Sequence, residues 1–223
     1  MASVRMRAAA TRRASLGGAR RLRALASWIV LALCCHALAA TTGDADRLAG
    51  RPLLAALKAG GLILYFRHAS TDFGQNDEQM TGYEDCTRQR NLTARGRDEA
   101  RAIGAAIARL GLPIGEVLAS PFCRTMETAR LIFGRATAAA AVRGGPPSGG
   151  ATERYAALRE LLSSPPPAGT DLVIVSHGNP FHAVAGEVYL AEGEAAVIQP
   201  LGAAGFRIVA RIPKDGWEAL GTA

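Results

Sequence analysis

Two short, almost wholly apolar runs constrain the fold of this chain more than any other feature of its sequence. They occupy residues 62–66 and 172–175. Apolar runs of this length between turn residues are typical of strands that are buried on both faces, and such strands occur in parallel sheets that helices cover on both sides. The sequence therefore predicts an α/β domain.

Segments with a helical spacing of apolar residues separate the predicted strands. We predict helices at residues 52–59, 94–110, 121–133, 153–162 and 181–189, and strands at 62–66, 117–119, 172–175, 195–198 and 206–210. Thr93 suits the N-cap of the second helix, and Ser120 and Pro121 suit the cap and first position of the third. Residues 134–150 show no period and predict a surface loop. This order predicts a three-layer α/β sandwich with a mostly parallel central sheet flanked by helices.

Arginines and histidines gather at one predicted edge of the sheet. Arg67 and His68 follow the first strand, and His177 follows the strand at 172–175. Arg124 lies in the first turn of the helix that follows the strand at 117–119. Because ligands of open α/β sheets bind beyond the carboxyl ends of the strands, we expect these four side chains to form one site.

The same residues carry a resemblance to a known family. Residues 67–71 resemble the RHG-type signature of the histidine phosphatase (phosphoglycerate-mutase-like) superfamily, and residues 91–96 resemble its L-T-x-x-G helix start. Residues 120–129 are similar to its S-x-x-x-R-x-x-x-T-A segment, and residues 176–178 to its second histidine motif. The resemblance spans residues 62–189, with each motif in the expected order and structural context.

This resemblance implies a role for each residue. His68 would be the nucleophile that forms a phosphohistidine, and His177 would stabilise the phosphoryl group rather than attack it. The residue types suit this chemistry, because a neutral imidazole can split one displacement into two, and the planar forks of Arg67 and Arg124 pair bidentately with phosphate. Arg90 matches an additional phosphate-binding arginine of some small members. A solvated arginine in a charged loop is an equal alternative there.

The proton donor for the leaving oxygen is open, since an ester substrate needs an acid. Some members of the family place an Asp directly after the second histidine, where this chain has Gly178. Others use a Glu before the second histidine, which nominates Glu153. Glu192, beyond His177, is a further candidate, and a surface position is the alternative for both glutamates. Without an acid, the substrate would need a good leaving group, as in a phosphoramidate or pyrophosphate.

The N-terminus has the pattern of an export signal. Seven arginines precede an apolar stretch at residues 24–38, and small residues at 37–39 suit a signal peptidase. We predict a signal peptide at residues 1–39, a single domain at residues 40–223, and a periplasmic or secreted protein. A retained membrane anchor is the alternative, although the apolar stretch is shorter than the roughly 20 residues of a span. Residues 11–16 resemble a twin-arginine signal.

The formal net charge of +7 does not indicate nucleic-acid binding. From residue 24 onward, 19 basic residues face 19 acidic ones, so the charge lies in the predicted signal. The mature chain keeps Cys86 and Cys123, which we expect to pair in an oxidising compartment, with two separate thiols as the alternative. Its three histidines lack ligand spacing, so we predict no metal and no cofactor.

Together these features predict a metal-independent phosphohydrolase of the phosphomonoesterase, histidine acid phosphatase-like type. Its partner would be a small phosphorylated substrate or a phosphorylated envelope component, with no nucleic acid and no stable membrane insertion after cleavage of the signal. Two alternatives stay open. One is a phosphotransferase of the phosphoglycerate-mutase type, which uses the same phosphohistidine. The other is a non-catalytic phosphoanion-binding protein of the same fold.

Overall fold

A computed structural model describes residues 47–143, 154–186 and 189–222 of the chain. The helices are α2 (Gly50–Ala59), α3 (Ala94–Leu110), α4 (Cys123–Phe133), α6 (Ala156–Ser163), α7 (Gly178–Ala185) and α8 (Gly216–Leu220). The strands are β1 (Ile63–Arg67), β2 (Ile114–Ala119), β3 (Thr137–Ala138), β4 (Asp171–Ser176), β5 (Ala195–Pro200) and β6 (Phe206–Ile212). Short 3-10 turns are η1 (Cys86–Arg88), η2 (Ala140–Val142) and η3 (Gly202–Ala204). The predicted signal peptide lies outside the described residues.

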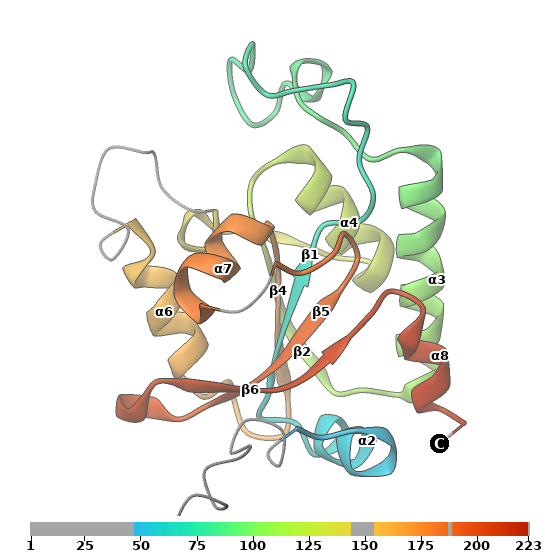
Figure 1. The fold of residues 1–223 in the computed structure, drawn as a ribbon, viewed down its shortest axis with the longest axis vertical. Coiled ribbons are helices and arrows are strands. Elements are labelled where there is room, and N and C mark those ends of the chain that lie inside the picture. The colour runs from blue at the N-terminus through green and yellow to red at the C-terminus, as the bar shows by residue number, and fades with distance from the viewer. Residues whose placement is uncertain (1–46, 144–153, 187–188, 223) are drawn as a thin grey trace, which may run out of the picture. The chain divides into compact units, whose positions relative to one another are not determined.

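The strands form one six-stranded sheet in the order β3-β2-β4-β1-β5-β6 (Figure 1). β1, β2, β3 and β4 run parallel to one another, whereas β5 is antiparallel to β1 and β6 is antiparallel to β5. The mostly parallel sheet predicted from the apolar runs is thus confirmed, with two antiparallel strands added at one edge.

Both faces of the sheet are covered, which explains why its central strands are apolar throughout. Side chains alternate along β1, so that Leu64 and Phe66 join the core under α2, α3, α4 and α8. Ile63 and Tyr65 join a second core under α6 and α7. Phe66 also stacks on Trp217 of α8, with ring centroids 5.5 Å apart. Because β1 is held from both sides, the residue that follows it starts from a rigid position.

Helix α3 begins where the sequence predicts, because Thr93 caps it. The Thr93 hydroxyl accepts the N–H of Gly96, and the Thr93 N–H donates to the carbonyl of Ser70. A Cβ at Gly96 would lie 2.0 Å from that same carbonyl oxygen. Glycine at 96 therefore lets the start of α3 pack directly on the segment that follows His68.

Several predicted boundaries differ from the structure, by a few residues in most elements and by more in the three segments described next. The helix expected to begin at Pro121 begins at Cys123 with Phe122 as N-cap, because the N–H of Ser120 donates to Val175 and extends the pairing of β2. The helix expected at 181–189 spans Gly178–Ala185 and ends at Gly186, whose φ of 63° is left-handed. Residues 137–142, expected in a loop, form β3 and η2, whereas residues 144–150 of that loop lie outside the described residues.

In the part of the chain that the structure describes, every helix is too short or too polar to span a bilayer.

Candidate active site

The pairing of β1 with β4 brings the two histidines together. In the parallel register Arg67 lies opposite Ser176, so His68 and His177 leave neighbouring strands at the same level. The N–H of His68 donates to the carbonyl of Ser176, and the two imidazole centroids are 5.6 Å apart. Two histidines that are more than 100 positions apart in the sequence thus share one site.

His68 is held as a neutral ring with one defined tautomer. It is 1% exposed, and its Nδ1 lies 3.0 Å from the carbonyl oxygen of Ala69. Because a carbonyl only accepts, Nδ1 carries the proton and Nε2 keeps a lone pair. Burial lowers the pKa of His68 to about 3, and the charges of Arg124, Arg67 and Arg90 act in the same direction. The hydrogen bond with Ala69 opposes this shift, because it raises the pKa.

His177 is fixed by contacts on several sides. Its Nε2 lies 2.8 Å from the Oγ of Ser120, and its ring stands perpendicular to Phe122 with centroids 5.1 Å apart. The hydroxyl of Tyr65 donates to its backbone carbonyl. Burial lowers the pKa of His177 well below its usual value, and the charge of Arg124 adds to this effect. The sequence predicts Ser120 as a helix cap and as the first residue of the S-x-x-x-R motif, but it does not predict the contact of Ser120 with His177.

Arg67 and Arg124 reach the site from different elements. Nη1 of Arg67 donates to the carbonyl of Leu190, 2.8 Å away. Arg124, in the first turn of α4, is 5% exposed, and its Nη1 lies 3.0 Å from Oδ1 of Asp77. Its guanidinium also lies over the ring of Phe122, 4.5 Å from the centroid. Burial lowers the pKa of both arginines, which nevertheless stay charged.

Arg90 lies close enough for its charge to lower the pKa of His68, His177, Arg67 and Arg124. Its guanidinium stands 5.0 Å from the ring centroid of Phe73, an exposed side chain of the loop that follows β1. The Nε atoms of Arg67, Arg90 and Arg124 are all buried and have no hydrogen-bond partner among the described residues. Three guanidinium groups whose charges act on both neutral imidazoles form a site suited to an anion.

Glu192 lies on the Nδ1 side of His68. Its Oε1 is 3.8 Å from that nitrogen and 3.6 Å from Nη2 of Arg67. Thr71 holds the carboxylate, its hydroxyl donating to Oε1 at 2.7 Å and its N–H to Oε2 at 3.2 Å. The structure therefore brings Glu192 to the site, whereas Glu153 lies outside the described residues.

Cys86 and Cys123 form a disulfide, with Cα atoms 5.7 Å apart. The bond joins η1 to the first residue of α4, next to Arg124. Gln89 reinforces this link, since its buried side chain accepts the N–H of Cys123 and donates to the carbonyl of Tyr83. The loop between β1 and α3 is thereby tied to the helix that carries Arg124.

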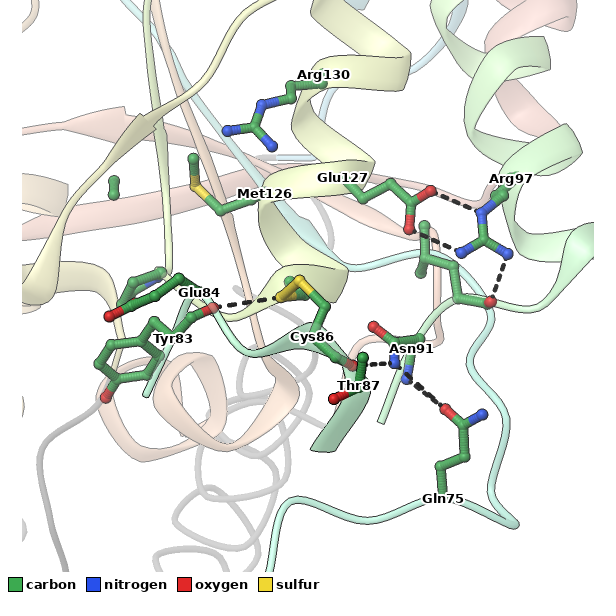
Figure 2. Close-up of a pocket in the computed structure, with 14 residues that line it drawn as sticks. Gln75, Tyr83, Glu84, Cys86, Thr87, Asn91, Arg97, Met126, Glu127 and Arg130 are labelled. Carbon is green, nitrogen blue, oxygen red and sulfur yellow. Dashed lines mark hydrogen bonds and ion pairs between the residues drawn. A yellow bond between two sulfur atoms is a disulfide. The ribbon is translucent and has the colours of Figure 1, made fainter. Parts of the chain in front are cut away.

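A cavity of about 1100 Å³ lies beside this disulfide (Figure 2). Both cysteines line it, together with Gln75, Tyr83 and the ion pair of Arg97 with Glu127. Neither histidine of the site and neither Arg67 nor Arg124 contributes to its lining. The cavity is therefore separate from the chemistry at the strand ends.

The arrangement suits nucleophilic attack on phosphorus. It offers one neutral ring nitrogen with a lone pair, a second neutral imidazole, and guanidinium groups that neutralise phosphate oxygens. Over residues 47–143, 154–186 and 189–222, no three His, Cys, Asp or Glu side chains are grouped as ligands of a metal ion would be.

Part of the chain is similar to a known protein family. Residues 63–145 match the family model described as histidine phosphatase superfamily, branch 1. No curated protein is significantly similar to the chain in sequence.

Several solved structures are similar to the chain at low sequence identity, and the first two described here have TM-scores above 0.5. A mycobacterial glucosyl-3-phosphoglycerate phosphatase in complex with inorganic phosphate has a TM-score of 0.52 and 14% identity, over 71% of this chain and 99% of its own. A structure described as mycobacterial hydrolase 1 has a TM-score of 0.51 and 15% identity, over 66% and 95%. The protein histidine phosphatase SixA with tungstate has a TM-score of 0.49 and 17% identity, over 69% and 97%.

Proposed function

We propose that the chain is a member of the histidine phosphatase superfamily, whose family model matches residues 63–145, and that it is a metal-independent phosphohydrolase that forms a phosphohistidine on His68. The observation that carries the proposal is the set of three guanidinium groups, of Arg67, Arg90 and Arg124, whose charges act on a neutral His68. Such donors match the oxygens of a phosphoryl group, and the hydrogen bond to Ala69 directs the lone pair of Nε2 toward it.

In this proposal, His177 donates a hydrogen bond to the phosphoryl group. If the Ser120 hydroxyl donates to Nε2, the ring proton of His177 stays on Nδ1, so the neutral ring can still donate a hydrogen bond. His177 then stabilises the transferring phosphoryl group without competing as a nucleophile. Arg67 and Arg124 neutralise the charge that builds up on the equatorial oxygens.

Glu192 supports the covalent intermediate. When Nε2 attacks phosphorus, the ring keeps its Nδ1 proton and becomes cationic. A carboxylate oxygen 3.8 Å from Nδ1 stabilises this charge. Because Thr71 and Arg67 hold the carboxylate beside Nδ1 of His68, Glu192 serves as a positioning group rather than as the leaving-group acid of the sequence-based hypothesis.

Export to the periplasm or beyond remains part of the proposal. The disulfide of Cys86 with Cys123 supports it, because disulfides persist mainly in oxidising compartments. The substrate class we propose is accordingly a small phosphomonoester or a phosphorylated envelope component.

The test is phosphate release from 4-nitrophenyl phosphate by residues 40–223, comparing wild type with Arg67→Ala and Arg124→Ala. Each loss should lower kcat/KM by about 10³-fold, because each removes a charged donor from the transition state. Arg101→Ala is the matched control, since Arg101 is 57% exposed and forms an ion pair with Asp98 of its own helix, α3.

Three other results would count against the proposal. Transfer of phosphate to an added alcohol in preference to water would favour the phosphotransferase. Binding of inorganic phosphate without turnover would favour the binding protein. Equal activity in all four proteins would show that the reaction takes place elsewhere on the chain.

A further inference from the structure

A phosphomonoester needs a proton on its leaving oxygen, and Glu192 is badly placed to supply it, whereas Glu153 lies outside the described residues. In an in-line displacement the leaving oxygen lies on the far side of phosphorus from Nε2 of His68. Glu192 lies on the Nδ1 side of the same ring, behind the nucleophile, where Thr71 holds it. The acid must therefore come from an element that reaches the outer side of the site.

Among the carboxylates that the structure describes, that of Asp77 meets this requirement. Asp77 belongs to the loop between β1 and η1, which extends beyond the carboxyl ends of the strands (Figure 1). Its Oδ1 lies 3.0 Å from Nη1 of Arg124 and accepts the N–H of Arg90 at 2.9 Å. Its side chain is 31% exposed, whereas that of Arg124 is 6% exposed and that of His68 is 2% exposed. Asp77 is thus the more exposed member of its pair with Arg124, whose guanidinium is buried.

A bound substrate would share Arg124 with this carboxylate. Oδ1 of Asp77 lies 3.0 Å from Nη1 of Arg124, and the same guanidinium is a clamp for the phosphoryl group. The shared arginine would therefore keep the carboxyl group of Asp77 close to the group that is transferred.

We propose that Asp77 is the general acid that protonates the leaving oxygen and the general base that activates water in the second step. This inference rests on the phosphohydrolase proposed above. It identifies a catalytic residue in a loop whose sequence has no recognisable period.

The reaction has two steps, phosphorylation of His68 and hydrolysis of the phosphohistidine. Nε2 of His68 forms a bond to phosphorus while the bond from phosphorus to the ester oxygen breaks, and that oxygen takes its electron pair and the Asp77 proton. The products are an alcohol, a phosphohistidine and ionised Asp77. Water then attacks phosphorus and gives a proton to Asp77, and the breaking bond returns its electron pair to Nε2.

The experiment measures kcat/KM for a series of substituted phenyl phosphates and for glycerol phosphate, with wild type and Asp77→Asn. A poor leaving group depends on the acid, whereas 4-nitrophenolate does not. We therefore expect Asp77→Asn to lower kcat/KM for glycerol phosphate by about 10²-fold or more and for 4-nitrophenyl phosphate by less than about threefold. The slope of log kcat/KM against the pKa of the leaving group should become steeper.

Two control variants separate an acid from a structural tether. Asp72→Asn, in the same loop, changes an exposed carboxylate that accepts only the N–H of Gly74, and its slope should equal that of wild type. Glu192→Gln should lower the rates of all substrates by a similar factor, because it acts through His68.

Equal losses of Asp77→Asn on good and poor leaving groups would overturn the proposal, and so would an unchanged slope. A wild type that releases no phosphate from any substrate would instead contradict the phosphohydrolase assignment itself.

Discussion

Nδ1 of His68 lies 3.0 Å from the carbonyl oxygen of Ala69, within a site where the imidazole is almost completely buried. The contact fixes which nitrogen carries the proton, and burial keeps the ring neutral. Nucleophilic attack needs both conditions at once, because a protonated or wrongly oriented ring has no lone pair directed at phosphorus.

The first prediction concerns the titration of His68. Because burial lowers its pKa to about 3, the ring should stay neutral, with its proton on Nδ1, from about pH 8 down to about pH 4. Nitrogen-15 NMR of histidine-labelled protein would show this, with His68→Asn used to assign the signal. A ring that takes up a proton between pH 6 and 7 would contradict the assignment.

A change in stability follows from the same pKa. Between about pH 6.5 and about pH 3 the unfolded chain binds a proton at His68 that the folded chain does not bind. The free energy of unfolding should therefore fall as the pH falls through this window. Urea titrations of wild type and His68→Asn should diverge at low pH and run parallel above about pH 7.

The second prediction concerns Ser120. Ser120→Ala removes the hydroxyl that lies 2.8 Å from Nε2 of His177, so His177 loses its orientation and its fixed proton. We expect kcat to fall about tenfold with little change in KM, which corresponds to the loss of one hydrogen bond. Ser120→Thr keeps the hydroxyl and should recover most of the rate. A Ser120→Ala enzyme with wild-type kcat would show that this contact is only structural.

The third prediction concerns the disulfide. Reduction of the bond between Cys86 and Cys123, which are 37 positions apart, should lower the free energy of unfolding by about 3 kcal/mol. It should also weaken the binding of inorganic phosphate, because the bond anchors the start of α4 beside Arg124. Urea titration and calorimetry with and without a phosphine reductant would measure both effects. The double variant Cys86→Ser with Cys123→Ser should not respond to the reductant.

The fourth prediction concerns Asp171, at the start of β4. Burial raises its pKa to about 6, although the N–H of Leu62 donates to its Oδ1, and its Oδ2 has no partner among the described residues. A folded pKa above the unfolded value means that the folded chain holds the proton more tightly. The stability of wild type should therefore fall as the pH rises from about 4 to about 6.

Asp171→Asn removes this titration. Relative to wild type, the variant should gain about 2 kcal/mol between pH 4 and pH 7 in urea unfolding. Asp98→Asn, at a side chain that is 77% exposed, is the matched control. An identical pH dependence of wild type and Asp171→Asn would contradict the raised pKa.

The sequence predicts the centre of this fold well, and the reason is physical. Apolar runs such as 62–66 have few alternatives to a buried strand, and parallel neighbours must present their carboxyl ends at one edge. The proximity of His68 to His177 follows from that rule and from the register of β1 with β4. The capped start of α3 is equally local, because Thr93 acts on a residue three positions away.

The parts that the sequence does not predict depend on long-range pairing or on irregular loops. Ser120 acts on a histidine 57 positions away, and only the pairing of β2 with β4 brings them together. Glu192 was nominated as an acid, but the side-chain direction that ties it to Thr71 depends on the turn before β5. Asp77 lies in a loop without a period, so its contact with Arg124 has no local signal.

The most direct test of the central claim is to find where the phosphoryl group is bound during turnover. Wild type and His68→Ala would be mixed with 4-nitrophenyl phosphate labelled at phosphorus, quenched rapidly in alkali, which preserves phosphohistidine, and digested to peptides. If His68 is the nucleophile, wild type should give a labelled peptide that contains His68, and His68→Ala should give neither label nor phosphate release. A label on any other residue, or phosphate release that survives His68→Ala, would contradict it.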